Sequence, residues 1–222
     1  MNKPLCSLAL SALIVSAHSL ASSNLYWQFE GDSEGISVYS REHTDGLVEI
    51  KTQMFTPTSY GAFLTLLEDS ENVPNWVDNV SSSRVLNQLS PTENIVYTQF
   101  SAPWPAKDRD MVTYSRYTQD ELGFTLTITD APPATFPLQE GYIRIESVNA
   151  QWQLQKLTSG TTLIEYTAFA DPGGALPNWL INKLAKESAR KTFENLKAQL
   201  PRYQAFQHPN VEESPKQSAV LE

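Results

Sequence analysis

Cysteine and histidine are nearly absent from this sequence, which contains one cysteine, Cys6, and three histidines among 222 residues. One cysteine cannot close an internal disulfide, and a metal site needs several Cys, His or acidic ligands at close spacing. His43 falls in a predicted hairpin turn and His208 in a predicted tail, and neither has a partner at ligand spacing. The sequence therefore predicts no metal ion and no cofactor.

Motifs for catalysis are also missing. The chain has no GxSxG, no HExxH and no glycine loop that would hold a phosphate. Its neighbouring carboxylates stand at predicted element ends, where they cap helices or are solvated: Glu68-Asp69, Asp108 with Asp110, and Asp120-Glu121. The pair Arg109-Asp110 opens a predicted strand, and we interpret it as a structural ion pair or turn lock. The sequence therefore predicts a protein that is not an enzyme.

Basic residues are fewer than acidic ones, with 16 Lys and Arg against 25 Asp and Glu and a formal net charge of −9. This balance argues against binding to nucleic acid and against electrostatic capture by anionic membranes. We interpret the acidic excess as a contribution to solubility.

A long hydrophobic run is lacking as well. The apolar stretch Leu5–Ala17 is too short to span a membrane, but with Lys3 before it and Ser19-Leu20-Ala21 after it the pattern is typical of a secretory signal peptide. We predict residues 1–21 as that peptide, cleaved after Ala21, with cleavage after Ala17 as the alternative. Cys6 would be removed with it, which fits a periplasmic or secreted bacterial protein.

Alternation of apolar and polar residues predicts a long series of strands. The clearest is Gly46–Phe55, which places Val48, Ile50, Thr52 and Met54 on one face. The other predicted strands are Gly35–Arg41, Ser83–Leu89, Glu93–Ser101, Arg109–Thr118, Gly123–Thr129, Gly141–Leu157 and Thr161–Ala170. Leu25–Glu30 is predicted as a helical turn. A helix starting at Thr56–Thr58 and a short one around Val73–Val77 complete the first half.

One long amphipathic helix closes the chain, from about Pro177 to Leu200. Its apolar face comprises Ile181, Ala185, Ala189, Phe193, Leu196 and Leu200. Such a helix needs an apolar surface, which only the preceding sheet can supply. Because the strands follow each other through short turns, we predict an α+β fold in which a curved antiparallel sheet wraps around this helix, the helix-grip arrangement. Residues 22–203 would form this domain, and residues 204–222 a disordered tail.

An ordered set of motifs resembles the START family of lipid-transfer domains, across roughly Leu25–Tyr203. The set comprises Trp76, Arg109-Asp110-Met111-Val112, Gly141-Tyr142-Ile143-Arg144, Trp152-Gln153-Leu154, Asp171-Pro172-Gly173-Gly174 and Trp179-Leu180-Ile181-Asn182. The resemblance implies an internal hydrophobic cavity roofed by the C-terminal helix. It further implies a monomer that binds one lipid (a sterol, a phospholipid or a fatty acyl lipid) and carries it between membranes through transient membrane contact.

The resemblance also assigns inward-facing, lipid-binding positions. They are Met111, Thr113 and Ser115; Ile143, Ile145 and Ser147; Ile164, Tyr166 and Ala168; and Ala189, Phe193 and Leu196. By the same alignment Arg144 points outward. Several lipid-binding members of the family carry an arginine where Ser115 stands, so we expect hydroxyl groups and the amide of Gln99 to form the polar end of the cavity.

Two alternatives to lipid transfer stay open at this point. One is an enzyme on the helix-grip scaffold, similar to a cyclase or hydrolase, acting on a hydrophobic small molecule. The other is a binding module whose core is filled. Trp104, between two prolines, and Trp179, at the start of the last helix, either touch a membrane or simply anchor their loops. Asp171–Gly174 is interpreted as a hinge for the helix.

Overall fold

The computed structural model describes residues 26–213. In chain order the elements are β1 (Gln28–Ser33), β2 (Ile36–Glu42), β3 (Val48–Thr56), α1 (Tyr60–Glu68), the single-turn helix η1 (Val73–Asn75), β4 (Val80–Ser90), β5 (Glu93–Phe100), β6 (Asp108–Asp120), β7 (Gly123–Asp130), β8 (Tyr142–Arg144), β9 (Glu146–Lys156), β10 (Thr162–Asp171), α2 (Asn178–Gln199) and η2 (Leu200–Tyr203). In this part of the chain no helix is long and apolar enough to cross a membrane.

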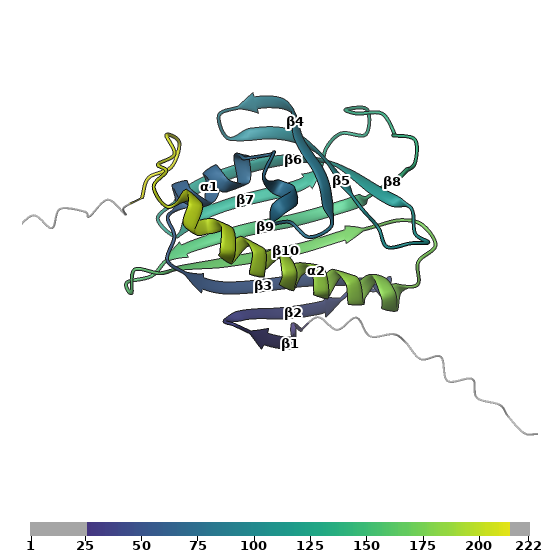
Figure 1. Cartoon of the computed structure of the whole chain (residues 1–222), viewed down its shortest axis with the longest axis horizontal. Helices are drawn as coiled ribbons and strands as arrows, with labels where there is room; N and C mark the ends of the chain where they lie inside the picture. Colours follow the sequence, from purple (N-terminus) through teal and green to yellow (C-terminus); the bar gives the residue numbers. More distant parts are fainter. Residues whose placement is uncertain (1–25, 214–222) are drawn as a thin grey trace, which may run out of the picture.

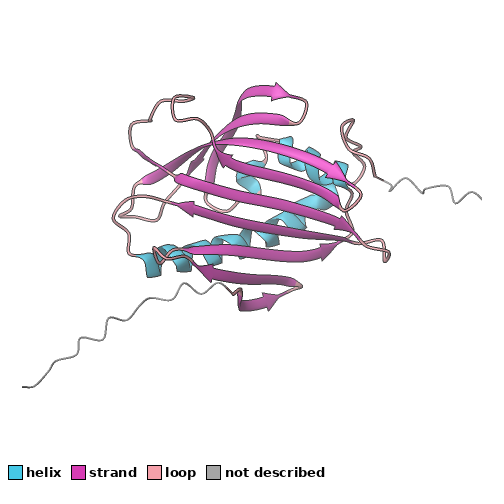
Figure 2. Cartoon of the chain, turned by 180° about the vertical axis from the view of Figure 1, so that it is seen from behind, coloured by secondary structure: helices cyan, strands magenta, loops and turns pink. Residues whose placement is uncertain are grey.

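The strands form a single curved sheet in the order β1-β2-β3-β10-β9-β7-β6-β5-β4, with β8 pairing to β6 beside this path. The last strand, β10, lies between β3 and β9, so it joins the N-terminal strands β1–β3 to the rest of the sheet. Both α-helices cover one face, and α2 runs across β3, β10 and β9 (Figure 1). Viewed from behind, the sheet lies in front of both helices (Figure 2). The predicted helix-grip architecture is therefore confirmed.

The main core lies between this face of the sheet and the two helices. Trp152 on β9 is at its centre and contacts Phe63 of α1, Trp76 and Phe193 of α2, with ring centroids 5.2, 6.3 and 5.6 Å away. Helix α1 begins at Tyr60 because the Ser59 side chain accepts a hydrogen bond from the backbone N–H of Ala62, 3.0 Å away. The core therefore packs α1 and the C-terminal part of α2 against the same strand, β9.

Two secondary-structure predictions were wrong. The opening segment is not a helical turn, because Gln28–Ser33 pairs with β2 as the edge strand β1. The single strand predicted over Gly141–Leu157 is two strands. Ile145 separates them, and Ser147, near the start of β9, takes a left-handed φ of 55° where the pairing with β10 shifts its register. The first of the two, β8, runs parallel to β6, whereas all other strand pairs described are antiparallel.

Residues 204–213, predicted as the start of a disordered tail, instead pack along α1. The Glu213 carboxylate accepts hydrogen bonds from the backbone N–H groups of Tyr60 and Gly61, at 3.1 and 2.6 Å, and pairs with Lys156. A Cβ at position 61 would lie 2.8 Å from the backbone nitrogen of His208, so only glycine permits this approach. The predicted signal peptide and residues 214–222 lie outside the described part of the chain.

Candidate functional site

The two halves of α2 differ in how they meet the sheet. In the C-terminal half Thr192, Phe193 and Leu196 are buried, and the ring of Phe193 stacks on Trp152 with an interplanar angle of 13°. These side chains fill the space between helix and sheet, as expected for an amphipathic helix on a solid core. This half of the helix is therefore structural.

In the N-terminal half the same apolar stripe continues, but its side chains are only half-buried. The helix contributes Ile181, Ala185 and Ala189, and the helix-facing side of the sheet carries Met111, Ile128, Ile143, Tyr166 and Ala168. We call these eight residues the half-buried layer. Native cores pack densely, so apolar side chains that face each other across a helix–sheet interface normally lose nearly all accessible surface. The half-buried layer therefore retains accessible apolar surface on the helix side of the sheet, and its Ile128 and Tyr166 also pack against the main core.

Tyr166 is at the boundary between the two halves. Its ring lies 4.3 Å from that of Trp152, centroid to centroid, and burial raises the pKa of its hydroxyl to about 12. The side chain nevertheless retains accessible surface. At this pKa the hydroxyl stays neutral and able to donate a hydrogen bond across the physiological range.

The predicted lipid-binding residues divide into three groups. Met111, Ser115, Ile143, Ile145, Tyr166, Ala168 and Ala189 are half-buried; Thr113, Ile164, Phe193 and Leu196 are buried; and Ser147 is exposed. Alternation along β6 and β10 places the predicted residues of those strands on the face that carries the core, as expected. Ser147 leaves this face because the backbone turns away there. That lipid contacts these residues stays a prediction.

Arg144 points to the outer face, as predicted, but it is half-buried there and not a free surface side chain. Its guanidinium forms two hydrogen bonds to the carboxylate of Asp110, at 2.7 and 3.0 Å, and that carboxylate is only 1% exposed. Tyr97 donates a third bond to Asp110 at 3.2 Å. The hydrogen bonds to Asp110 raise the pKa of Arg144, whereas burial, followed by the nearby charge of Asp110, raises the pKa of Tyr97. The ion pair expected within Arg109-Asp110 therefore forms between Asp110 and Arg144.

This ion pair belongs to a second, smaller core on the other face of the sheet. Ile95, Tyr97, Val112 and Ala131 form it, together with Leu86 and Phe136. Gln99 lies on this face too, because it pairs in register with Asp110, and its side chain accepts a hydrogen bond from Ser82 at 2.6 Å. The prediction that Gln99 contributes to the polar end of an inner cavity was therefore wrong, since the alternation of β5 points it outward.

Arg109 was missed by the prediction of site residues. It is 6% exposed and alternates with Asp110, so it lies on the inner face beside Met111 and in register with Ile143. Its guanidinium donates to the backbone carbonyl groups of Lys107, Pro172 and Gly173. A strand-opening arginine after the proline-rich loop 102–107 was the available signal, but the sequence does not show which face it takes.

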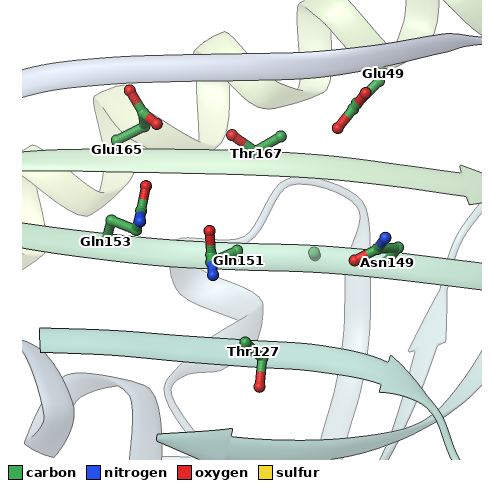
Figure 3. Close-up of a pocket in the computed structure, with 8 residues that line it drawn as sticks. Glu49, Thr127, Asn149, Gln151, Gln153, Glu165 and Thr167 are labelled. Carbon is green, nitrogen blue, oxygen red and sulfur yellow. The ribbon is translucent and has the colours of Figure 1, made fainter. Parts of the chain in front are cut away.

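A shallow depression of about 240 Å³ lies on the opposite, solvent-facing side of the sheet (Figure 3). Its lining is polar and comprises Glu49, Thr127, Asn149, Ala150, Gln151, Gln153, Glu165 and Thr167. It is smaller than the roughly 300–1,000 Å³ of typical ligand pockets. Surface side chains engage one another here, since Glu49 pairs with Arg41 and Gln53 donates to Glu165. We therefore interpret it as a solvated sheet face.

Within residues 26–213 no group of three or more Cys, His, Asp or Glu side chains is arranged to hold a metal ion. The half-buried layer itself contains one titratable group, Tyr166, and Arg109 lies at its edge. The arrangement is thus an apolar surface with a neutral hydroxyl and one cation. Its chemistry suits the binding of a largely apolar molecule.

Comparison with known proteins identifies relatives over most of the chain. The family model for the START domain matches residues 10–205. A crystal structure of a STAR-related lipid transfer protein from Xanthomonas axonopodis superposes with a TM-score of 0.72 at 29% identity, covering 79% of this chain and 98% of that one. Human START domain-containing protein 10 is 23% identical over 88% of this chain and 71% of its own length.

Two further relatives carry functional names. Mouse phosphatidylcholine transfer protein is 26% identical over 72% of this chain and 77% of its own length. Mouse acetyl-coenzyme A thioesterase is 24% identical over 71% of this chain, but the match covers only 29% of that enzyme. Lipid transfer and an enzymatic activity are thus both named among proteins similar to this chain.

Proposed function

Because this chain belongs to the START domain family, we propose that it binds a single lipid in the half-buried layer under the first half of α2 and transfers it between membranes. The observation that carries the proposal is the contrast within one helix. Phe193 and Leu196 are fully buried, while Ile181, Ala185 and Ala189, on the same face, are not. Covering that apolar surface with an acyl chain or ring system gains roughly 25 cal/mol per Å².

Filling the layer with protein should prevent lipid binding. We expect Ala189→Trp to reduce the fraction of lipid-bound protein at least about tenfold, since an indole placed between α2 and β10 occupies the volume that the ligand needs. The matched control is Ala198→Trp, which introduces the same side chain on the exposed side of the helix. Native mass spectrometry of both variants, with extraction and identification of the bound lipid, measures the effect. Equal lipid occupancy in the two variants would contradict this location.

Phe193, another of the predicted lipid-binding residues, is a poor position for such a test, as a change such as Phe193→Asp illustrates. The side chain has no accessible surface and stacks on Trp152 in the filled core. A carboxylate there would be buried without a partner, so the variant would unfold and lose lipid for that reason alone. A substitution at position 189 therefore tests lipid occupancy of the half-buried layer separately from the stability of the core.

We further propose that loops at one end of the sheet contact the membrane. Trp104, Leu138 and Trp179 are 92%, 76% and 69% exposed and lie in three different segments. Hydrogen bonds hold these segments together, because Arg109 reaches the loop before α2 and Arg144 reaches Pro137. Tryptophan is enriched where proteins meet the membrane–water interface, and uncharged side chains suit an acidic protein that anionic lipids do not attract.

The double variant Trp104→Ala/Trp179→Ala should slow lipid transfer between vesicles about tenfold or more, while the lipid occupancy of the protein in solution stays unchanged. Leu122→Ala is the control, because Leu122 is exposed at the β6–β7 turn, the other end of β6. A fluorescence assay with labelled donor and acceptor vesicles gives the rate. A double variant that transfers lipid as fast as the Leu122 variant would exclude this docking surface.

We place the mature protein in the periplasm or outside the cell, as a monomer without enzymatic activity. The support is the signal-peptide pattern of residues 1–21 and a half-buried layer whose one titratable group is a neutral tyrosine. Fractionation of cells and the mass of the mature protein test the location, and retention of Met1 in a cytoplasmic fraction would refute it.

A further inference from the structure

Arg109 is a buried cation, and among the residues that the structure describes it has no ion-pair partner. Arginine is seldom buried unless it is paired, and a buried guanidinium is expensive to leave uncompensated. Within residues 26–213 no carboxylate lies at ion-pair distance from it. Its acceptors are three backbone carbonyl groups, which carry no net charge.

The acidic residues beside Arg109 in the sequence, and the one beside the Pro172–Gly173 segment it contacts, bind other groups. Asp108 accepts a hydrogen bond from the backbone N–H of Ala102, and Asp110 is bound to Arg144 on the opposite face of the sheet. Asp171 is exposed and accepts from the backbone N–H of Gly173. Acidic residues are therefore present close to Arg109 in the sequence, but within residues 26–213 the fold pairs none of them with its guanidinium.

The guanidinium also has capacity for another acceptor. A guanidinium has five N–H donors, and three of those of Arg109 are in use. The contacts to Pro172 and Gly173 are both 3.4 Å long, whereas charge-assisted bonds to an anionic oxygen are about 2.7–2.9 Å. Arg109 is in register with Ile143, and both lie against Gly174, where a Cβ would be 3.1 Å from Ile143 and 3.3 Å from Arg109. It thus borders the half-buried layer.

We propose that Arg109 binds the anionic head of the lipid, a carboxylate or a phosphate group, while its apolar part covers the half-buried layer. This assignment rests on the proposed function and narrows its ligand class from lipids in general to lipids with an anionic oxygen group. The inner face of β6 then carries this cation near its start, followed by Met111, Thr113, Ser115 and Tyr117.

The test compares lipids that share their apolar part and differ only in charge. One pair is oleate and oleyl alcohol, and the second is dioleoyl phosphatidic acid and dioleoylglycerol. Each is bound to the lipid-free full-length protein, and affinity is measured by displacement of a fluorescent lipid. Wild-type protein should prefer the anion in at least one pair by about 10- to 100-fold, the range expected for hydrogen bonds to a charged group. The pair that shows the preference distinguishes carboxylate from phosphate.

Arg109→Gln should lose that preference while retaining the affinity for the uncharged lipid. Arg116→Gln is the matched control, since Arg116 lies on the same strand but on the other face and is largely exposed. The assignment is overturned if wild-type protein binds anion and neutral lipid equally. It is also overturned if Arg109→Gln weakens both members of a pair by the same factor, because Arg109 then only holds the loop before α2. Wild-type protein that binds none of the four lipids contradicts the proposed function itself.

Discussion

Replacing Arg144 with alanine should lower the free energy of unfolding by about 3–5 kcal/mol, the range for removing one partner of a buried ion pair. The Asp110 carboxylate, 1% exposed, would keep only the hydrogen bond from Tyr97 and would be left as a buried charge without a counter-ion. The variant would also lose the bonds that Arg144 donates to the carbonyl groups of Phe136 and Pro137, which hold the β7–β8 loop over the second core. Urea unfolding followed by circular dichroism measures the change.

A double-mutant cycle separates the ion pair from the rest of this effect. Asp110→Ala/Arg144→Ala should be more stable than the sum of the two single changes predicts, since neither charge is then left alone. Arg116→Ala removes an arginine from the exposed side of β6, where its distance to Glu93 is 3.9 Å, and should change stability little. Additive single changes would show that Asp110 and Arg144 do not stabilise each other.

The architecture was predictable because the periodicities are strong and extend over long segments. The alternation in β3, β6, β7 and β10 and the spacing of three and four residues in α2 each fix a buried face. The order in which the strands pair, with β10 between β3 and β9, does not follow from those patterns alone. It became predictable only through the ordered motifs of the family.

The outward direction of Arg144 followed from the alternation, but the exposure of Ser147 could not be read from the same pattern. An unbroken strand over Gly141–Leu157 gives one alternation, but the strand is interrupted at Ile145 and Ser147. Beyond such a break the faces no longer follow from counting. β8 takes its register from β6, where Asp110 pairs with Arg144 and Arg109 with Ile143.

Periodicity was equally unable to show that α2 has two different halves. Ala189 and Phe193 occupy equivalent positions on the helix, yet one is half-buried and the other has no accessible surface. The difference depends on what lies opposite. The rings of Trp152, Phe63 and Trp76 form the filled core against which Phe193 stacks, whereas the smaller Ala168 and Ile128 stay half-buried. The burial of a helix residue depends on the volume of the sheet residues that face it. Which residues face each other is set by the tertiary structure and does not follow from periodicity.

Trp152→Ala should lower the free energy of unfolding by about 3–5 kcal/mol, the range for removing a buried tryptophan. Its ring contacts side chains from α1, α2 and β10, so the cavity left behind cannot be closed by moving one element. The control is Trp179→Ala, which removes the same side chain from an exposed position and should change stability little. Thermal and urea unfolding compare the two variants.

The loss of stability in Trp152→Ala tests how the fold tolerates the accessible apolar surface of the half-buried layer. Incomplete packing in the half-buried layer reduces stability, so other contacts of α2 must hold the helix in place. Trp152 and Phe193 provide them, at the end of α2 opposite to its start. If Trp152→Ala unfolds as easily as predicted, one half of the helix stabilises the fold and frees the other half to bind a ligand. A Trp152→Ala variant as stable as Trp179→Ala would mean instead that α2 is held at its start, by Asn182 against Gly46 and Val48.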